Sequence, residues 1–230
     1  MLDEIKDEQG SPFNKSYGYR ALLKNRNFLF LWLGQIFSQL GDRIIFVVFV
    51  ALIAGKFGSS TTLQSWLYIS FTIPAIILTS IAGVFIDRVN KKQILVTTNL
   101  IRAGLILMMP LFSKTLFGIY TLAFLISSAT QFFIPTEASS IPYLVDKKHL
   151  LAANSLFTTT MMGSIILGFV LGDPLINIFS LNSVHFAIFI MFLTATGWLL
   201  FVKNESLKKK IYTKTYKDFF MELKEGFIYT

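Results

Sequence analysis

The chain has 230 residues, of which 53% are hydrophobic and 15% are charged, and it contains no cysteine. Soluble domains carry about 25% charged residues, so this composition excludes an ordinary cytosolic domain and a disordered segment. The lack of cysteine excludes thiol catalysis, a disulfide scaffold and cysteine-ligated zinc. What remains is a membrane protein that crosses the lipid several times.

Six stretches of the chain are long and apolar enough to cross a bilayer as helices. A crossing needs about 20 mostly apolar residues, because about 30 Å of hydrocarbon is spanned at about 1.5 Å per residue. The stretches are continuously apolar rather than alternating, which excludes a β-barrel. We therefore expect an all-α membrane protein with six transmembrane helices. The predicted spans are Phe28–Ala54, Leu63–Ile86, Gln93–Phe112, Leu116–Ser139, Leu151–Ile178 and Ser183–Val202.

The distribution of Lys and Arg predicts the orientation of these spans. Segment 1–27 is polar and has no apolar core of a signal peptide. If it lies inside the cell, 17 basic residues lie inside and only 2, Lys56 and Lys114, lie outside. Because basic residues concentrate on the cytoplasmic side, we expect an inner-membrane bundle at 28–202 between two cytoplasmic segments, 1–27 and 203–230. The excess positive charge then meets anionic lipid head groups and not nucleic acid.

Charged residues inside the first predicted span are informative, because each costs about 2.5–3.5 kcal/mol at a helix centre. Asp42 and Arg43 lie near its middle, and Arg43 points about 100° away from Asp42. Gln35, Ser38 and Asp42 are spaced i, i+3 and i+7, so they share one helix face. This polar stripe either faces a water-filled cavity, with Asp42 responding to protons or cations, or makes polar contacts that only hold the bundle together.

Arg102 in the third predicted span has three interpretations. It is a counter-ion for Asp42 across the bundle, a binding group for an anionic part of a substrate, or a side chain that snorkels to the inner interface. The last interpretation is preferred. The fourth span carries a smaller polar patch, which consists of Ser127, Thr130 and Gln131.

Small residues recur every four positions in the fifth predicted span, at Ser164, Gly168 and Gly172. Such a stripe allows the backbone of another helix to approach closely. We therefore predict that these three residues form a helix-packing surface.

The loop between the second and third predicted spans reads GVFIDRVNKK and gathers charges at the inner face. Gly83 permits close helix contact, and Asp87 can accept hydrogen bonds from the N-terminal amides of a facing helix. The basic residues that follow can pair with an acid such as Glu137. The cluster predicts a latch that holds one conformation, and its residues are Gly83, Asp87, Arg88, Lys91 and Lys92.

Nothing in the sequence predicts catalysis. There is no Gly-x-Ser-x-Gly motif, no phosphate-binding glycine loop and no paired carboxylates. The two histidines, His149 and His185, flank different membrane faces and cannot form a metal site. We expect no enzyme activity, no metal and no cofactor.

The loop GVFIDRVNKK matches the pattern Gly-x-x-x-Asp-Arg-x-x-(Arg/Lys)-(Arg/Lys), and with this motif after the second span the chain resembles the major facilitator superfamily. Nearly the whole chain is similar to one branch of it, the bacterial exporters of macrolides, enterobactin and related small molecules. Asn99 stands where relatives commonly carry an acidic residue. The stretches that carry the branch resemblance are FLFLWLGQIFSQLGD at 28–42, TTNLIRAG at 97–104, FFIPTEASSIPYLV at 132–145 and LLAANSL at 150–156.

The resemblance implies the N-terminal six-helix half of a carrier, built from two inverted three-helix repeats, that alternates between inward-open and outward-open states. It implies efflux of small amphipathic compounds, with Asp42 as the coupling carboxylate and with a second copy or a separate C-terminal half as partner. The alternatives are a truncated membrane fragment or interaction module without transport, and a facilitator or importer of the same superfamily. The expected substrate or ion pathway consists of Gln35, Ser38, Asp42, Arg102 and Gln131.

Overall fold

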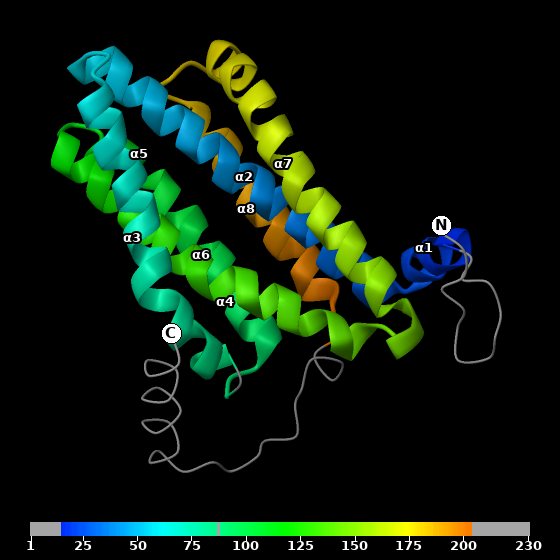
Figure 1. The fold of residues 1–230 in the computed structure, drawn as a ribbon. Helices are drawn as coiled ribbons and strands as arrows, with labels where there is room; N and C mark the ends of the chain where they lie inside the picture. Colours follow the sequence, from blue (N-terminus) through cyan, green and yellow to red (C-terminus); the bar gives the residue numbers. More distant parts are fainter. Residues whose placement is uncertain (1–14, 87, 204–230) are drawn as a thin grey trace, which may run out of the picture.

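The structure is a computed structural model that describes residues 15–86 and 88–203, and all secondary structure in these ranges is helical (Figure 1). The predicted all-α class is confirmed. Asp87 of the expected latch and almost all of the expected cytoplasmic segment 203–230 lie outside the described residues. The helices are α1 (Lys15–Lys24), α2 (Arg26–Phe57), α3 (Thr61–Ile86), α4 (Lys91–Leu107), α5 (Met109–Phe112), α6 (Leu116–Leu144), the 3₁₀ turn η1 (Lys147–His149), α7 (Leu150–Phe179) and α8 (Val184–Phe201).

Five of the described helices are long and apolar enough to cross a membrane: α2, α3, α6, α7 together with η1, and α8. The predicted third span is instead divided into α4, which has 17 residues, and the short α5. The division falls at Met108, whose N–H donates to Leu105 O at 3.0 Å. Pro110 explains it, because proline has no N–H for the carbonyl of Ile106 and its ring would clash with that carbonyl in a continuous helix.

Two groups of three helices pack with the symmetry that the resemblance implies: the first group is α2, α3 and α4, and the second is α6, α7 and α8. The first helix of the first group, α2, packs against α7 and α8 of the second group. In the same way α6, the first helix of the second group, packs against α3 and α4 of the first group, and the last helices of the two groups, α4 and α8, pack against each other. Exchanging α2, α3 and α4 for α6, α7 and α8 leaves this pattern of contacts unchanged. Because consecutive helices run antiparallel, the two groups have opposite orientations in the membrane, as inverted repeats do.

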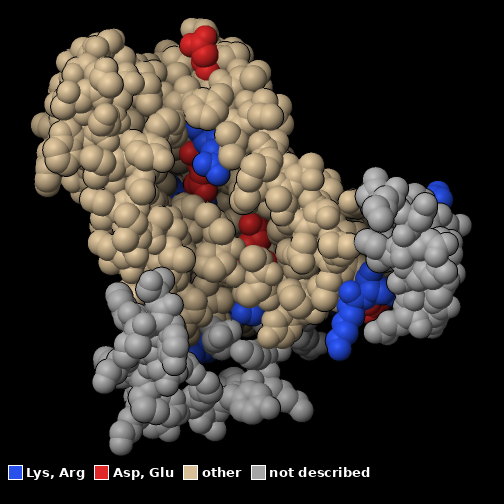
Figure 2. All heavy atoms as spheres, in the orientation of Figure 1, with Lys and Arg blue, Asp and Glu red and all other residues tan. Residues whose placement is uncertain are grey.

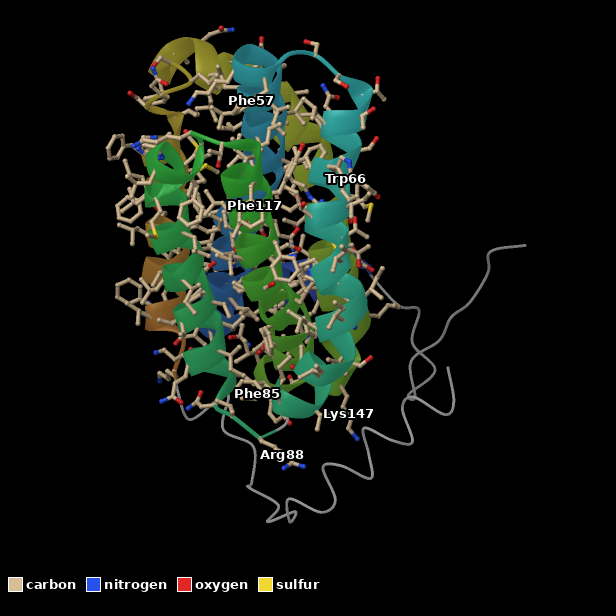
Figure 3. The ribbon with its side chains drawn as sticks, turned by 90° about the vertical axis from the view of Figure 1, so that its left-hand side faces the viewer. Phe57, Trp66, Phe85, Arg88, Phe117 and Lys147 are labelled. Atoms are coloured by element: carbon tan, nitrogen blue, oxygen red, sulfur yellow. The ribbon has the colours of Figure 1, made fainter. Side chains whose placement is uncertain are left out.

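The apolar side chains divide between a packed centre and an exposed outer surface. In the centre, Phe49, Ile106, Ile126 and Ile188 are at most 1% exposed. On the outside, large apolar side chains project from the helices, including Trp66 of α3 and Phe117 of α6 (Figure 3). An exposed apolar surface of this extent is stable in lipid rather than in water, so the protein is a multi-pass membrane protein.

The two ends of the bundle differ in charge. Arg88 and Lys147 lie at one end, and Phe57 and the α2–α3 connection lie at the other (Figure 3). At the basic end, α1 is a helix that the sequence did not predict. The Asn25 side chain caps α2 by accepting from Phe28 N at 3.3 Å, and it also donates to Leu144 O at 2.6 Å, which ties the start of α2 to the end of α6.

Candidate functional site

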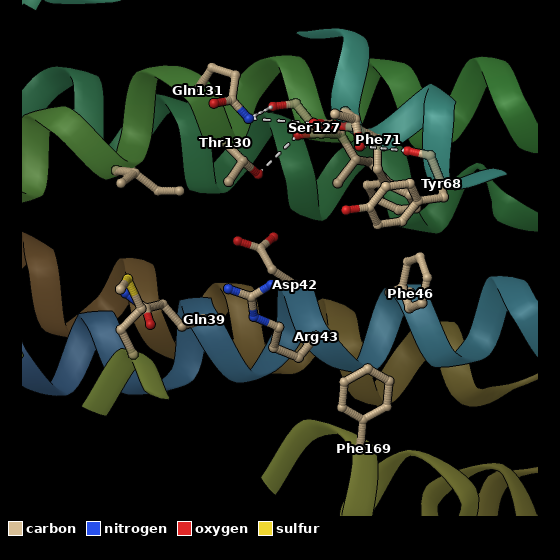
Figure 4. Close-up of a pocket in the computed structure, with 14 residues that line it drawn as sticks. Gln39, Asp42, Arg43, Phe46, Tyr68, Phe71, Ser127, Thr130, Gln131 and Phe169 are labelled. Carbon is tan, nitrogen blue, oxygen red and sulfur yellow. Dashed lines mark hydrogen bonds between the residues drawn. The ribbon is translucent and has the colours of Figure 1, made fainter. Parts of the chain in front are cut away.

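A cavity of about 340 Å³ lies between α2, α3, α6 and α7, near the middle of the bundle. Figure 2 shows acidic and basic atoms in a hollow near the middle of this face. The wall is mixed: α2 supplies charged groups, α6 supplies hydroxyl and amide groups, and aromatic rings come from α2, α3 and α7. The lining residues used below are Gln39, Asp42, Arg43, Phe46, Tyr68, Phe71, Ser127, Thr130, Gln131 and Phe169 (Figure 4).

Asp42 forms an ion pair with Arg102 behind the cavity wall. Arg102 Nη1 donates to Asp42 Oδ2 at 2.6 Å, and Arg102 Nη2 donates to Ser38 Oγ at 2.8 Å and to the Asn99 side-chain oxygen. The Arg102 side chain is 0% exposed, whereas the Asp42 side chain is 19% exposed. The preferred interpretation that Arg102 snorkels to the interface is therefore wrong, because the guanidinium is buried against a carboxylate deep in the bundle.

Two aromatic rings complete the enclosure of Arg102. Its guanidinium carbon lies 4.4 Å from the centre of the Phe133 ring and 4.9 Å from the centre of the Phe192 ring. A guanidinium between two ring faces is stabilised by their quadrupoles without access to water. Arg102, on α4, thus belongs to the interior of the bundle, where it contacts α2, α6 and α8, and it does not line the cavity.

Arg43 lies on the cavity side of α2. Its guanidinium is beside the Asp42 carboxylate, which points towards Thr130 of α6 (Figure 4). The Arg43 Nε atom is buried and has no hydrogen-bond partner. The sequence shows Arg43 inside a span, but no role was predicted for it. Its charge near the centre of a membrane helix was the signal that could have identified it as a cavity residue.

Glu137 lies inside the bundle and not beside the loop lysines. It is 3% exposed, accepts a 3.4 Å hydrogen bond from Gln39 Nε2, and its Oε1 atom has no hydrogen-bond partner. Gln39 also accepts from Ser164 Oγ at 3.3 Å, so it links α6 to α7 across α2. The expected pairing of Glu137 with the basic loop is not found, because its side chain points into the helix core. Sequence reasoning gave Gln39 no role.

The structure separates the five residues of the expected pathway. Asp42 and Gln131 line the cavity. Ser38 and Arg102 lie behind it in the ion-pair cluster. Gln35 is 2% exposed and donates to the backbone carbonyl of Phe157 in α7 at 3.2 Å, so it joins two helices.

The small residues of α7 lie against α2. A Cβ atom placed on Gly168 would collide with the Cβ of Arg43, and one on Gly172 would lie 2.6 Å from Cγ1 of Val47. Ser164 is 3% exposed on the same side of the helix. The close approach of α7 therefore fixes the position of the Arg43 stem beside the cavity.

The loop residues of the expected latch lie at the basic end of the bundle. Lys92 Nζ donates to the carbonyls of Leu200 at 2.6 Å and Val202 at 2.7 Å, which caps the C-terminal end of α8. Lys91 is 2% exposed and lies 5.7 Å from the Tyr143 ring centre. Arg88 is exposed. Gly83 is exposed too, and a Cβ built on it meets no described atom within 4 Å.

The model of the Major Facilitator Superfamily matches residues 31–224 of the chain. The chain belongs to this superfamily. It is 29% identical over 153 residues to YkuC of Bacillus subtilis (strain 168), an uncharacterized MFS-type transporter, with 66% of this chain and 35% of YkuC covered. It is 27% identical over 209 residues to YfiS of the same organism, also an uncharacterized MFS-type transporter, with 90% of this chain and 50% of YfiS covered.

The chain therefore spans at most half the length of these two curated relatives. No solved structure matches it significantly. Superfamily membership and the membrane-length helices of the described residues together identify a membrane protein from a family of transporters.

Proposed function

We propose that the chain is the N-terminal half of a secondary-active transporter that exports small amphipathic compounds by alternating access. The observation that carries the proposal is the cavity of about 340 Å³ between α2, α3, α6 and α7, which combines aromatic surface with charged and amide groups. Small-molecule sites have this character, with a mostly apolar wall and a few convergent polar groups. A cavity of this kind at the middle of a membrane bundle suits a substrate that is partly apolar.

A second half is needed to enclose the substrate. The chain covers 50% of YfiS and 35% of YkuC, and the cavity opens at the surface of the described residues. A second six-helix unit, as a C-terminal half or a second copy, supplies the missing wall in our proposal. Alternating access is then rocking of one unit against the other around a central site.

We propose that the loop at the basic end works as the conformational latch, through Gly83, Asp87, Arg88, Lys91 and Lys92. The capping of α8 by Lys92 supports a joint that links the α3–α4 loop to the last helix. The position of Arg88 and Lys147 at one end of the bundle supports cytoplasmic termini and an inner-membrane location, because basic residues favour the cytoplasmic face.

The test is energy-dependent dye flux in cells that express the chain from its native gene. Cells are loaded with a panel of amphipathic fluorescent dyes, and loss of dye is followed with and without an uncoupler. We expect uncoupler-sensitive efflux that Asp42→Asn abolishes. Asp173→Asn is the matched control and should leave efflux unchanged, because Asp173 is exposed near the far end of α7 and bonds only locally to Asn177.

Two outcomes would contradict the proposal. Accelerated uptake in place of efflux would assign the protein as an importer or facilitator. Absence of any flux, with the protein folded in the membrane, would assign it as a fragment or interaction module without transport.

A further inference from the structure

Arg43 is the cavity residue whose charge the bundle leaves available. Its Nε atom is buried and has no hydrogen-bond partner among the described residues. A buried donor without a partner is unfavourable by itself and indicates a group that is satisfied by something else. Because Arg43 lines the cavity, a molecule inside the cavity is well placed to accept from it.

The neighbouring carboxylate does not remove this charge. Asp42 is the acidic residue of the cavity wall, and its Oδ2 atom is already held by Arg102 at 2.6 Å. Two guanidinium groups, Arg43 and Arg102, therefore share this carboxylate, whereas Glu137, a further carboxyl group in the interior, accepts from Gln39 and does not line the cavity. Arg43 is the cationic residue among those that line the cavity, and its charge attracts anions and repels cations there.

Gly168 prevents Arg43 from moving away from the cavity. The backbone of α7 approaches so closely at this glycine that the Cα, Cβ and Cγ atoms of Arg43 lie against it. The stem is thus fixed between α2 and α7, and only the end of the side chain is free to move. A charge that is held in place before the ligand arrives binds an anion with a small loss of conformational entropy.

The rest of the wall defines the other part of the ligand. Four aromatic side chains surround the space next to Arg43, and Gln131 and Thr130 lie on the opposite side. A cavity of about 340 Å³ lies within the range for small-molecule sites. The aromatic residues are Phe46, Tyr68, Phe71 and Phe169.

We infer that the substrate is an amphipathic anion, with a carboxylate or sulfonate bound by Arg43 and an aromatic or apolar body against the four aromatic side chains. This inference rests on the proposed function, because it names the substrate class of the same cavity. It assigns to Arg43 the anion-binding role that the sequence had offered as one alternative for Arg102.

The test compares two probes that share a fluorophore and differ in charge. Dansylglycine carries a carboxylate, and dansylcadaverine carries an ammonium group. Binding of each is measured by equilibrium dialysis against the purified chain in nanodiscs of neutral phosphatidylcholine. We expect saturable binding of dansylglycine, about tenfold or more tighter than that of dansylcadaverine.

Variants then locate the charge. Arg43→Gln should weaken dansylglycine binding about tenfold or more, because a hydrogen bond to a charged group is lost. Arg43→Lys should retain most of the affinity, which separates loss of charge from loss of fold. Lys114→Gln removes the same charge from an exposed loop position and should change neither affinity.

Preference of the wild-type chain for dansylcadaverine, or no saturable binding of dansylglycine, would overturn the inference. Equal dansylglycine affinity in wild type and Arg43→Gln would also overturn it. Because binding is measured without flux, the two proposals fail separately. Efflux without anion preference would refute only the substrate class, and anion binding without flux would refute only the transport function.

Discussion

The ion pair between Asp42 and Arg102 makes a quantitative prediction about stability. Asp42→Asn keeps the shape of the side chain and removes its negative charge. Arg102 is then left without its ion-pair partner, although it is 0% exposed and enclosed by aromatic rings. Removing one member of a buried pair typically costs about 3–5 kcal/mol, because the remaining charge keeps its desolvation penalty. We expect a loss of this size in the free energy of unfolding.

Removal of the other member of the pair should cost less free energy of unfolding. After Arg102→Met, the Asp42 carboxylate still interacts electrostatically with Arg43 and is 19% exposed, so water and a second cation compensate it in part. In the Arg102→Met background, Asp42→Asn should therefore have a small effect. The interaction energy of the double-mutant cycle is the difference between these two effects of Asp42→Asn, so it should reach about 3 kcal/mol or more, at or above the upper end of the range for residues in contact.

The assay is reversible unfolding of the purified chain in mixed micelles with increasing mole fraction of SDS, followed by circular dichroism. Asp173→Asn, at an exposed position, serves as the control and should stay within about 0.5 kcal/mol of the wild type. If Asp42→Asn unfolds within about 1 kcal/mol of the wild type and the two single changes are additive, the ion pair does not stabilise the bundle.

The remaining predictions concern packing, capping and orientation. Gly172→Leu should destabilise the bundle by about 1–3 kcal/mol in the SDS assay, because its new side chain meets α2. Gly163→Leu on the same helix is the control and should be nearly neutral, because a Cβ atom there meets nothing within 4 Å. Lys92→Met removes two hydrogen bonds to the last carbonyls of α8 and should cost about 1–2 kcal/mol; unchanged thermal unfolding would contradict this cap. Because the chain has no cysteine, Lys114→Cys should react with an impermeant maleimide from outside intact cells and Lys147→Cys only after permeabilisation; the opposite pattern would reverse the proposed orientation.

Part of the site was visible in the sequence as residue types and spacing. The charges Asp42, Arg43 and Arg102 stood out because charged residues are rare in apolar spans. The four-residue spacing of Gly168 and Gly172 predicted close packing, and both lie against α2. Neither observation showed that the neighbour of Gly168 is Arg43.

The division of the third span could have been predicted more closely. Pro110 follows the apolar part of α4 and removes one backbone hydrogen bond. A hydropathy count does not register it, because proline changes the sum very little. The helix α1 was not predicted, because its polar composition gives no signal of a membrane span. In the packed structure its residue Leu22 is nevertheless only 2% exposed.

The sequence by itself determined the all-α membrane class and the approximate places of the helices, because the free energy of crossing a bilayer is a local sum over about 20 residues. The tertiary structure alone decided which charges meet. Arg102 is 60 residues from Asp42 in the chain, yet the rotation of α4 against α2 and α8 makes it the partner of that carboxylate. Helix rotation follows from side-chain packing over the whole bundle, and no local stretch of sequence contains that information.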